Sequence, residues 1–218
     1  MPKTAKEIEE LLAAPFPASE VQWVVMATTG KGDGAMKGKV GAYIDPRTVR
    51  GRFNAVVGIA GWQSDHYPVG AHQMACKIGV YFPEIGWVWK SDGAWVGNID
   101  VDISKAQNPS KAEDEVEKNA KGSFSDAFKR AAFSWGVGEY LYELDSPWIT
   151  LDDKKRIPRE EMPRLNQIAD AALGKWQAER RERAERARQQ AAKEAAAAAA
   201  LANAPITGPG VTNASAPA

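Results

Sequence analysis

The stretch KGSFSDAFKRAAFSW, residues Lys121 to Trp135, decides the fold because it is the clearest amphipathic helix in the chain. At about 100° per residue, four of its side chains lie within about 60° of one another and predict a buried stripe: Phe124, Phe128, Ala131 and Trp135. The opposite face carries Lys129, Arg130 and Phe133. An aromatic side chain between two cations suits either a surface for phosphates and bases or a subunit contact that covers the ring.

End signals set the length of this helix. We expect it to begin at Asn108-Pro109, with a capping box from Ser110 and Glu113, and to end at Gly136. Gly122 costs about 1 kcal/mol relative to alanine, which predicts a break or close backbone packing at that point.

Three strands are expected before the helix. Apolar residues alternate with polar ones in Ala71–Phe82 and, more regularly, in Trp95–Ile103. Between them, Ile85–Lys90 reads as a strand that a turn at Ser91–Ala94 joins to the last one. The pattern predicts an antiparallel meander with one face in water.

The residues before this meander predict two helices and two strands. In chain order these are a helix at Thr4–Ala13, strands at Val21–Thr29 and Val40–Ile44, and a helix at Pro46–Val57 with Asp45 as its N-cap and Gly58 at its end. The predicted fold class is therefore α+β, an antiparallel β-meander with helices packed on one face and a β-β-β-α core.

Composition indicates one compact domain with an appendage. The chain has 218 residues, 44% of them hydrophobic, and its 28 basic residues balance 28 acidic ones. We expect a domain at residues 1–158, a charged helical extension at 159–195 and a disordered Ala/Pro/Gly-rich tail at 196–218. The amphipathic N-terminus is unlike a signal peptide and no apolar run is long enough for a membrane span, which predicts a cytoplasmic protein.

The sequence offers little for catalysis or metal binding. Asp100 and Asp102 fit the polar positions of a strand better than a metal site, and the spacing of His66, His72 and Cys76 makes a weak ligand set. No nucleophile stands beside a base. We therefore expect no metal, no cofactor and no enzymatic activity.

Charge is distributed unevenly along the chain. Acidic residues predominate between positions 91 and 120, and basic residues between positions 30 and 60: Lys31, Lys37, Lys39, Arg47, Arg50 and Arg52. Eight tryptophans are a further excess. A basic patch concentrates polyanions even on a neutral protein, although such a run is also common as a solvated surface.

Two segments resemble a known family. They are KGSFSDAFKRAAFSWGVGEYLYEL, which begins at Lys121, and YIDPRTVRGRFNAVVGIAGWQ, from Tyr43 to Gln63. Both are similar to signatures of the Rad-fifty-two superfamily of single-strand annealing proteins, nearest to its phage and bacterial, DdrA-like branch. The resemblance covers about residues 20 to 150. It implies a β-β-β-α core assembled into a ring or filament, with single-stranded DNA in a basic groove.

The resemblance also suggests residues for DNA binding. Lys129 and Arg130 match the paired basic residues of the family's inner groove, and Arg47 lies in the helix where a family arginine contacts the DNA backbone. Phe133 stands where some relatives carry a third basic residue. Charge alone adds the remaining candidates: Lys31, Lys37, Lys39, Arg50, Arg52 and Lys121.

The function expected from these features is ATP-independent binding of single-stranded DNA and annealing of complementary strands in recombination and repair. The expected partners are single-stranded DNA, further copies of the chain and a host single-stranded DNA-binding protein, with no membrane. One alternative is a module that coats single strands without annealing them. A second is a metal-dependent nuclease that uses Asp100 and Asp102.

Overall fold

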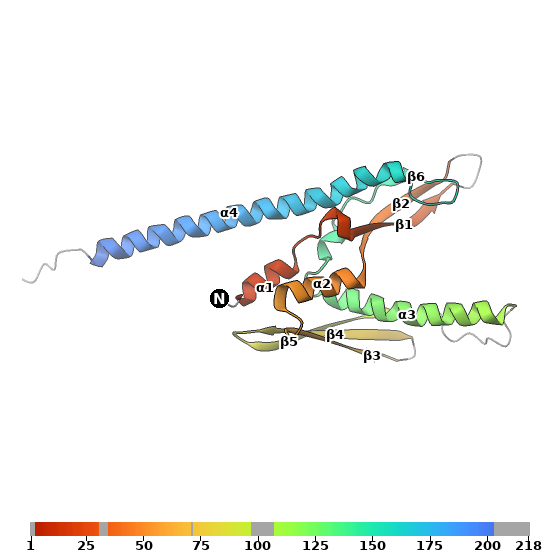
Figure 1. The fold of residues 1–218 in the computed structure, drawn as a ribbon, viewed down its shortest axis with the longest axis horizontal. Helices are drawn as coiled ribbons and strands as arrows, with labels where there is room; N and C mark the ends of the chain where they lie inside the picture. The colour runs from red at the N-terminus through yellow and green to blue at the C-terminus, as the bar shows by residue number, and fades with distance from the viewer. Residues whose placement is uncertain (1–2, 31–34, 71, 97–106, 203–218) are drawn as a thin grey trace, which may run out of the picture. The chain divides into compact units, whose positions relative to one another are not determined.

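The computed structural model describes residues 3–30, 35–70, 72–96 and 107–202 (Figure 1). It divides into a compact unit up to Trp176 and a second unit from Gln177. In chain order its elements are α1 (Ala5–Leu12), η1 (Ala18–Glu20), β1 (Val21–Thr29), β2 (Lys37–Ile44), α2 (Pro46–Val57), β3 (Trp62–Pro68), β4 (Gln73–Phe82), β5 (Gly86–Trp95), α3 (Pro109–Phe133), η3 (Glu139–Tyr142), β6 (Trp148–Thr150), η4 (Arg159–Glu161) and α4 (Met162–Ala202).

One sheet, called sheet B here, carries the predicted β-β-β-α core. Its antiparallel strands lie in the order β3-β4-β5, and α3 crosses one face of the sheet (Figure 1). Every second residue of β4 points toward the helix and is buried, as Cys76, Ile78 and Val80 show. The predicted α+β class and the helix-covered meander are confirmed.

The strand boundaries in sheet B differ from the prediction. The predicted turn at Ser91–Ala94 is wrong, because these residues continue β5 and pair with β4. The strand predicted over Trp95–Ile103 begins where β5 ends, and residues 97–103 lie outside the described residues. The third strand is β3, an edge strand that buries few of its side chains. Its sequence WQSDHYP is therefore mostly polar and shows no hydrophobic alternation.

The second sheet, called sheet A, contains β1, β2 and β6 in the order β1-β2-β6. β2 begins at Lys37 rather than Val40, because residues 37–39 pair with β1 on one side and β6 on the other. A bulge in β1 separates Val25 from Ala27. One face is buried through Val21 and Trp23, and the other is open.

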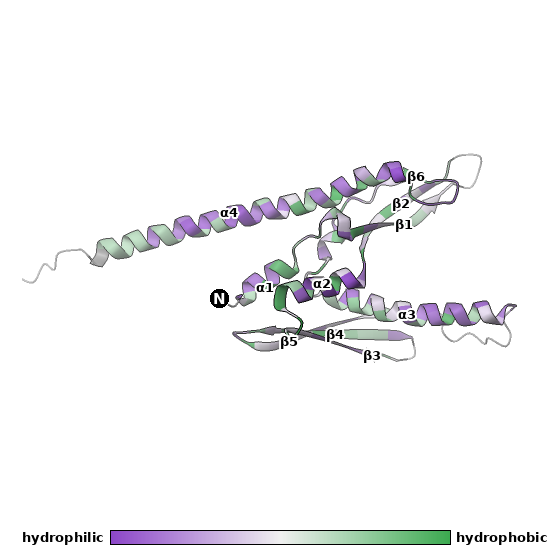
Figure 2. Cartoon of the chain, viewed as in Figure 1, coloured by the Kyte–Doolittle hydropathy of each residue, from purple (hydrophilic) through white to green (hydrophobic). Residues whose placement is uncertain are grey.

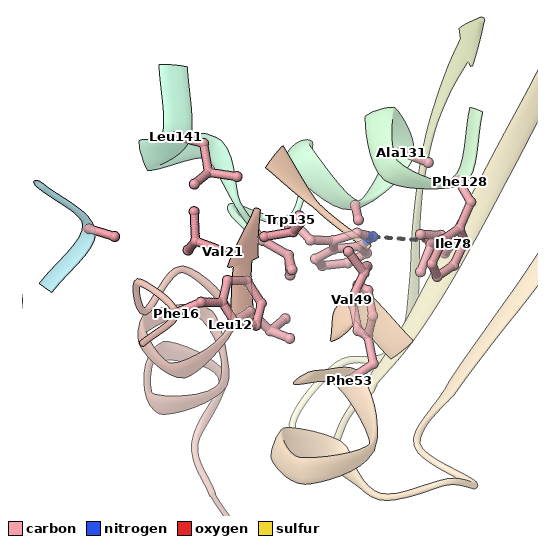
Figure 3. Close-up of a cluster of buried hydrophobic side chains, with 14 of the residues drawn as sticks. Leu12, Phe16, Val21, Val49, Phe53, Ile78, Phe128, Ala131, Trp135 and Leu141 are labelled. Carbon is pink, nitrogen blue, oxygen red and sulfur yellow. Dashed lines mark hydrogen bonds between the residues drawn. The ribbon is translucent and has the colours of Figure 1, made fainter. Parts of the chain in front are cut away.

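The core lies between the helices and the two sheets (Figure 3). Phe128, Ala131 and Trp135 are buried in it as predicted, and the Trp135 indole Nε1–H donates to the carbonyl oxygen of Ile78 at 3.2 Å. Phe124 was predicted to share this core and does not, since it is 45% exposed. Its ring lies 5.2 Å from the ring of His66 on the edge strand β3.

Two expectations about the long helix are also corrected. The N-cap of α3 is Asn108, whose side chain accepts from the backbone N–H of Lys111, rather than Ser110. The helix passes through Gly122 without a break, and a Cβ at Gly122 would meet no atom within 4 Å. The first turns of α3 are hydrophilic (Figure 2). No neighbouring element packs closely against the helix at Gly122 within the described residues.

The last helix, α4, anchors its start in the first unit. Leu165 and Ala169, one turn apart, are buried there. Residues 177–200 are exposed, and ion pairs one turn apart join side chains such as Arg186 and Glu182. None of the helices within the described residues is long and apolar enough to cross a membrane.

Candidate nucleic-acid interface

A cleft of about 660 Å³ separates sheet A from α3 and the end of β5. Sheet A contributes Met26, Gly41 and Tyr43 to its lining, and β5 contributes Trp95. From α3 and the turn after it come Lys129, Arg130, Phe133 and Tyr142. The cleft therefore brings together three of the four candidate residues of α3, with cations and aromatic rings on the same walls.

Lys129 is held in the cleft wall by two contacts. Its ammonium lies 4.2 Å from the centroid of the Tyr43 ring and 3.0 Å from an Asp126 carboxylate oxygen. The side chain is only 12% exposed. A cation held over an aromatic face with one small opening acts as a fixed point charge for an anion that enters the cleft.

Arg130 is more open and is paired with the neighbouring strand. Its Nε and Nη2 donate to Asp92 Oδ1 at 3.3 and 3.2 Å, and Nη2 also lies 3.2 Å from Asp92 Oδ2. The backbone N–H of Gly93 donates to the same carboxylate at 2.6 Å. Asp92 is in place because β5 continues through the predicted turn.

Phe133 faces the cleft rather than bare solvent. Its ring meets Tyr142 edge-to-face at 5.3 Å. The chain can turn closely behind it because Gly138 has a φ of 80°, and a Cβ there would lie 2.6 Å from Cδ1 of Ile44. The GVG sequence after α3 thus lets Tyr142 reach the aromatic wall.

The open face of sheet A continues the cleft. Every second residue of β2 from Lys37 to Tyr43 lies on this face. Two of these residues, Lys37 and Lys39, are exposed lysines. Trp148 of β6 pairs with Lys39 and is 47% exposed. Cations and aromatic rings therefore extend from the cleft over the open face of sheet A.

Comparison with known families identifies the family of the chain. The model of the Rad52/22 family double-strand break repair protein matches residues 4–159. The chain belongs to this family. The resemblance found in the two sequence segments is thereby confirmed.

Two relatives of the family are similar over most of the chain. The single-stranded DNA-binding protein DdrA of Deinococcus radiodurans is 30% identical over 163 residues, which are 75% of this chain and 67% of the relative. The protein of the same name from Deinococcus deserti is 30% identical over 152 residues, 70% of this chain and 65% of the relative. The chain thus spans about two thirds of the length of the curated relatives it matches.

Three other candidates lie on helix surfaces outside the cleft lining. Arg47 is exposed and pairs with Asp45 at 3.1 Å. The pKa of the Asp45 carboxyl is lowered, chiefly because the backbone N–H of Arg47 donates to it. The guanidinium of Arg50 lies 4.8 Å from the ring centroid of Phe128. Lys121 is exposed two turns before the cleft and pairs with Glu117.

Arg52 has a different environment from the other candidates. Its guanidinium donates to the backbone carbonyls of Leu11, Leu12, Ala14 and Pro15 and lies 3.9 Å from the ring centroid of Phe16. Burial lowers the pKa of this guanidinium. These carbonyls lie in the last turn of α1 and in the residues just after it, where helix carbonyls have no partner within the helix. Arg52 therefore joins α2 to α1, and we leave it out of the interface.

The last candidates are one lysine for DNA binding and the residues considered as metal ligands. Lys31, Asp100 and Asp102 lie outside the described residues. Within those residues, no three His, Cys, Asp or Glu side chains lie close enough together to hold a metal ion. Burial raises the pKa of the Cys76 thiol to about 11, so this cysteine is protonated near neutral pH.

Sequence reasoning missed the aromatic partners in the cleft. Tyr43, Trp95 and Tyr142 come from three separate elements and meet α3 only in the folded chain. The local signal for two of them was weak, since Tyr43 and Trp95 read as ordinary strand residues.

Proposed function

We propose that this protein binds single-stranded DNA in the cleft and along the open face of sheet A, and anneals complementary strands without ATP. The observation that carries the proposal is the cleft wall itself, where Lys129 and Arg130 stand beside the rings of Tyr43 and Phe133. Relatives named for single-stranded DNA binding support the same ligand.

The chemistry needed for annealing matches such a surface. Two complementary strands repel each other through their phosphates, and lysine and arginine side chains reduce that repulsion without reading sequence. The contacts with the backbone leave base edges available for pairing. Neither step consumes a nucleotide. Aromatic side chains next to the cations can hold bases apart from self-structure.

Self-association would extend this surface. Each sheet has two edge strands within the described residues, β1 and β6 in sheet A and β3 and β5 in sheet B. Unpaired edges favour pairing with further chains, and a ring or filament would repeat the cleft along one strand of DNA. Repetition of weak sites raises the affinity for long strands without new contacts.

The test is annealing of two complementary fluorescent oligonucleotides without ATP, with light scattering for the mass of the protein. We expect acceleration by a large oligomer. Tight binding without acceleration would leave a coating protein. Absence of binding would contradict the proposal, and magnesium-dependent loss of labelled DNA would instead indicate a nuclease.

A further inference from the structure

The face of sheet B turned away from α3 carries a group of half-exposed rings. Tyr81 of β4 is 45% exposed, and Trp87 and Trp89 of β5 are 38% and 45% exposed. Strand pairing places Tyr81 beside Trp87, and Gly79 beside Trp89. Lys77 lies on the same face of β4. We call Lys77, Tyr81, Trp87 and Trp89 the aromatic platform; none of them lines the cleft.

Trp89 lies flat on the sheet. A Cβ added at Gly79 would be 2.8 Å from each of three successive ring carbons of Trp89, Cε3, Cζ3 and Cη2. A point equally close to three neighbouring ring atoms lies over the face of the ring rather than beside its edge. The glycine thus makes room for the indole, which is still 45% exposed on its other side.

The neighbouring rings support this orientation. The plane of Trp87 is tilted by only 26° from that of Trp89, with the centroids 5.9 Å apart. Tyr81 meets Trp87 edge-on at 5.7 Å. Because the two indoles are nearly parallel with centroids only 5.9 Å apart, they stack with an offset, and the exposed parts of both rings lie on this side of the sheet.

A cation stands next to the two indoles. The Lys77 ammonium lies 5.4 Å from the centroid of a Trp89 ring. Asp65 of β3 shares this cation at 3.5 Å, but it is one strand further from the rings. Across the sheet the order is therefore ring, cation and carboxylate, which leaves the positive charge nearest the platform.

We propose that the aromatic platform is a base-stacking site for single-stranded nucleic acid, separate from the cleft. Bases stack on Trp89 and Trp87, and Lys77 contacts the adjoining phosphate. The inference rests on the proposed function, since it assigns a second contact to the same ligand. Flat π faces beside a cation favour nucleobases, whereas protein docking sites typically use a tryptophan that inserts into a pocket.

The test compares two strands of equal length, oligothymidine and an abasic oligonucleotide with the same phosphates. Fluorescence anisotropy with the full chain should show tighter binding of the thymidine strand by wild type. In Trp87→Leu/Trp89→Leu, apolar bulk stays over Gly79 but the flat rings are lost. We expect thymidine affinity to fall by about tenfold and abasic affinity to stay unchanged.

Matched variants separate stacking from other roles. Trp87→Phe/Trp89→Phe keeps flat rings and should recover most of the affinity for thymidine. Ile85→Ala removes an exposed apolar side chain at the β4–β5 turn and should change neither affinity. Circular dichroism checks that the leucine variant is folded.

Three results would overturn the platform. One is equal affinity of wild type for the two strands, which needs no variant at all. Another is unchanged thymidine affinity in the leucine variant. A third is equal loss for both strands with a smaller mass in light scattering, which would make the platform a subunit contact. If Lys129→Ala/Arg130→Ala still lowers the affinity for both strands, the proposal that the cleft binds DNA is unaffected by any of these three results. If wild type binds neither strand, the proposed function fails as well.

Discussion

Arg52 on α2 and Arg130 on α3 are both helical arginines in basic, aromatic stretches, yet their surroundings are opposite. Arg52 donates to four carbonyls in the last turn of α1 and just after it, whereas Arg130 is half-exposed in the cleft and pairs with Asp92. The difference comes from what each helix packs against. α2 lies against the C-terminal end of α1, whose carbonyls Arg52 reaches, whereas the side of α3 that carries Arg130 borders the cleft. A run of basic residues therefore marks a binding surface only where the fold leaves the charges free.

The largest effect should come from Arg52→Ala. Four carbonyls lose their donor and Phe16 loses the guanidinium over its ring, so we expect a loss of about 2–4 kcal/mol in the free energy of unfolding. Urea denaturation measures it. Arg50→Ala, which loses a cation–π contact of an exposed arginine with the buried ring of Phe128, should cost about 1 kcal/mol or less. A stable Arg52→Ala protein with weakened DNA binding would reverse the comparison.

Lys129→Ala/Arg130→Ala should have its effect on binding instead. We expect the affinity for single strands to fall by about a hundredfold at low salt, and the slope of log affinity against log salt to fall by about 1.4. Stability should fall by about 1–2 kcal/mol, because Lys129 is only 12% exposed and loses its contact with the Tyr43 ring, whereas the Arg130 pair is half-exposed.

The control for this pair is Lys6→Ala/Arg164→Ala, which removes the same charge from side chains that do not line the cleft. Its salt slope should match that of wild type. Equal slopes for all three proteins would remove Lys129 and Arg130 from the interface.

A smaller effect of opposite sign is expected for Asp92→Asn. The Asp92 carboxylate competes with DNA phosphates for Arg130, and the amide keeps the shape of the side chain without its charge. Affinity should rise by about threefold, since a half-exposed ion pair is worth up to about 1 kcal/mol. Anisotropy titrations at two salt concentrations measure the gain. A loss of affinity would mean that Asp92 chiefly orients Arg130.

The smallest effect concerns Asp45, the N-cap of α2. Its folded pKa is lowered by the N–H of Arg47, so the carboxylate stabilises the fold above its unfolded pKa of about 4. This contribution is lost as pH falls through the lower, folded pKa. Asp45→Asn keeps a good cap but does not titrate, so wild type should lose more stability than the variant as the pH falls below about 4. Identical pH profiles in denaturant titrations would contradict this role.

Local signals predicted the elements that depend on local structure. β1 matches its predicted range of Val21–Thr29, and α2 begins after Asp45 and ends at Gly58 as expected. The strands of sheet B were harder to predict, because residues Ser91–Ala94 pair with β4 instead of forming a turn. The polar strand β3 also forms by pairing with β4. Neither effect is visible in a window of neighbouring residues.

The candidate site was predictable in part for the same reason. Lys129, Arg130 and Phe133 share one helix face, so periodicity and resemblance could find them together. Tyr43 reaches Lys129 from a strand 86 residues earlier (129 − 43), a contact made only by the fold. Arg52 was predicted to bind DNA, because the sequence shows its charge but not the backbone carbonyls to which it donates.

Ultraviolet crosslinking of oligothymidine to the full chain, with peptides mapped by mass spectrometry, tests the central claim most directly. The cleft account predicts crosslinks at Tyr43, Phe133, Trp95 or Tyr142, with further crosslinks at Trp87 and Trp89 if the aromatic platform also binds. Crosslinks confined to residues 177–202, with none in β2 or the second half of α3, would contradict it.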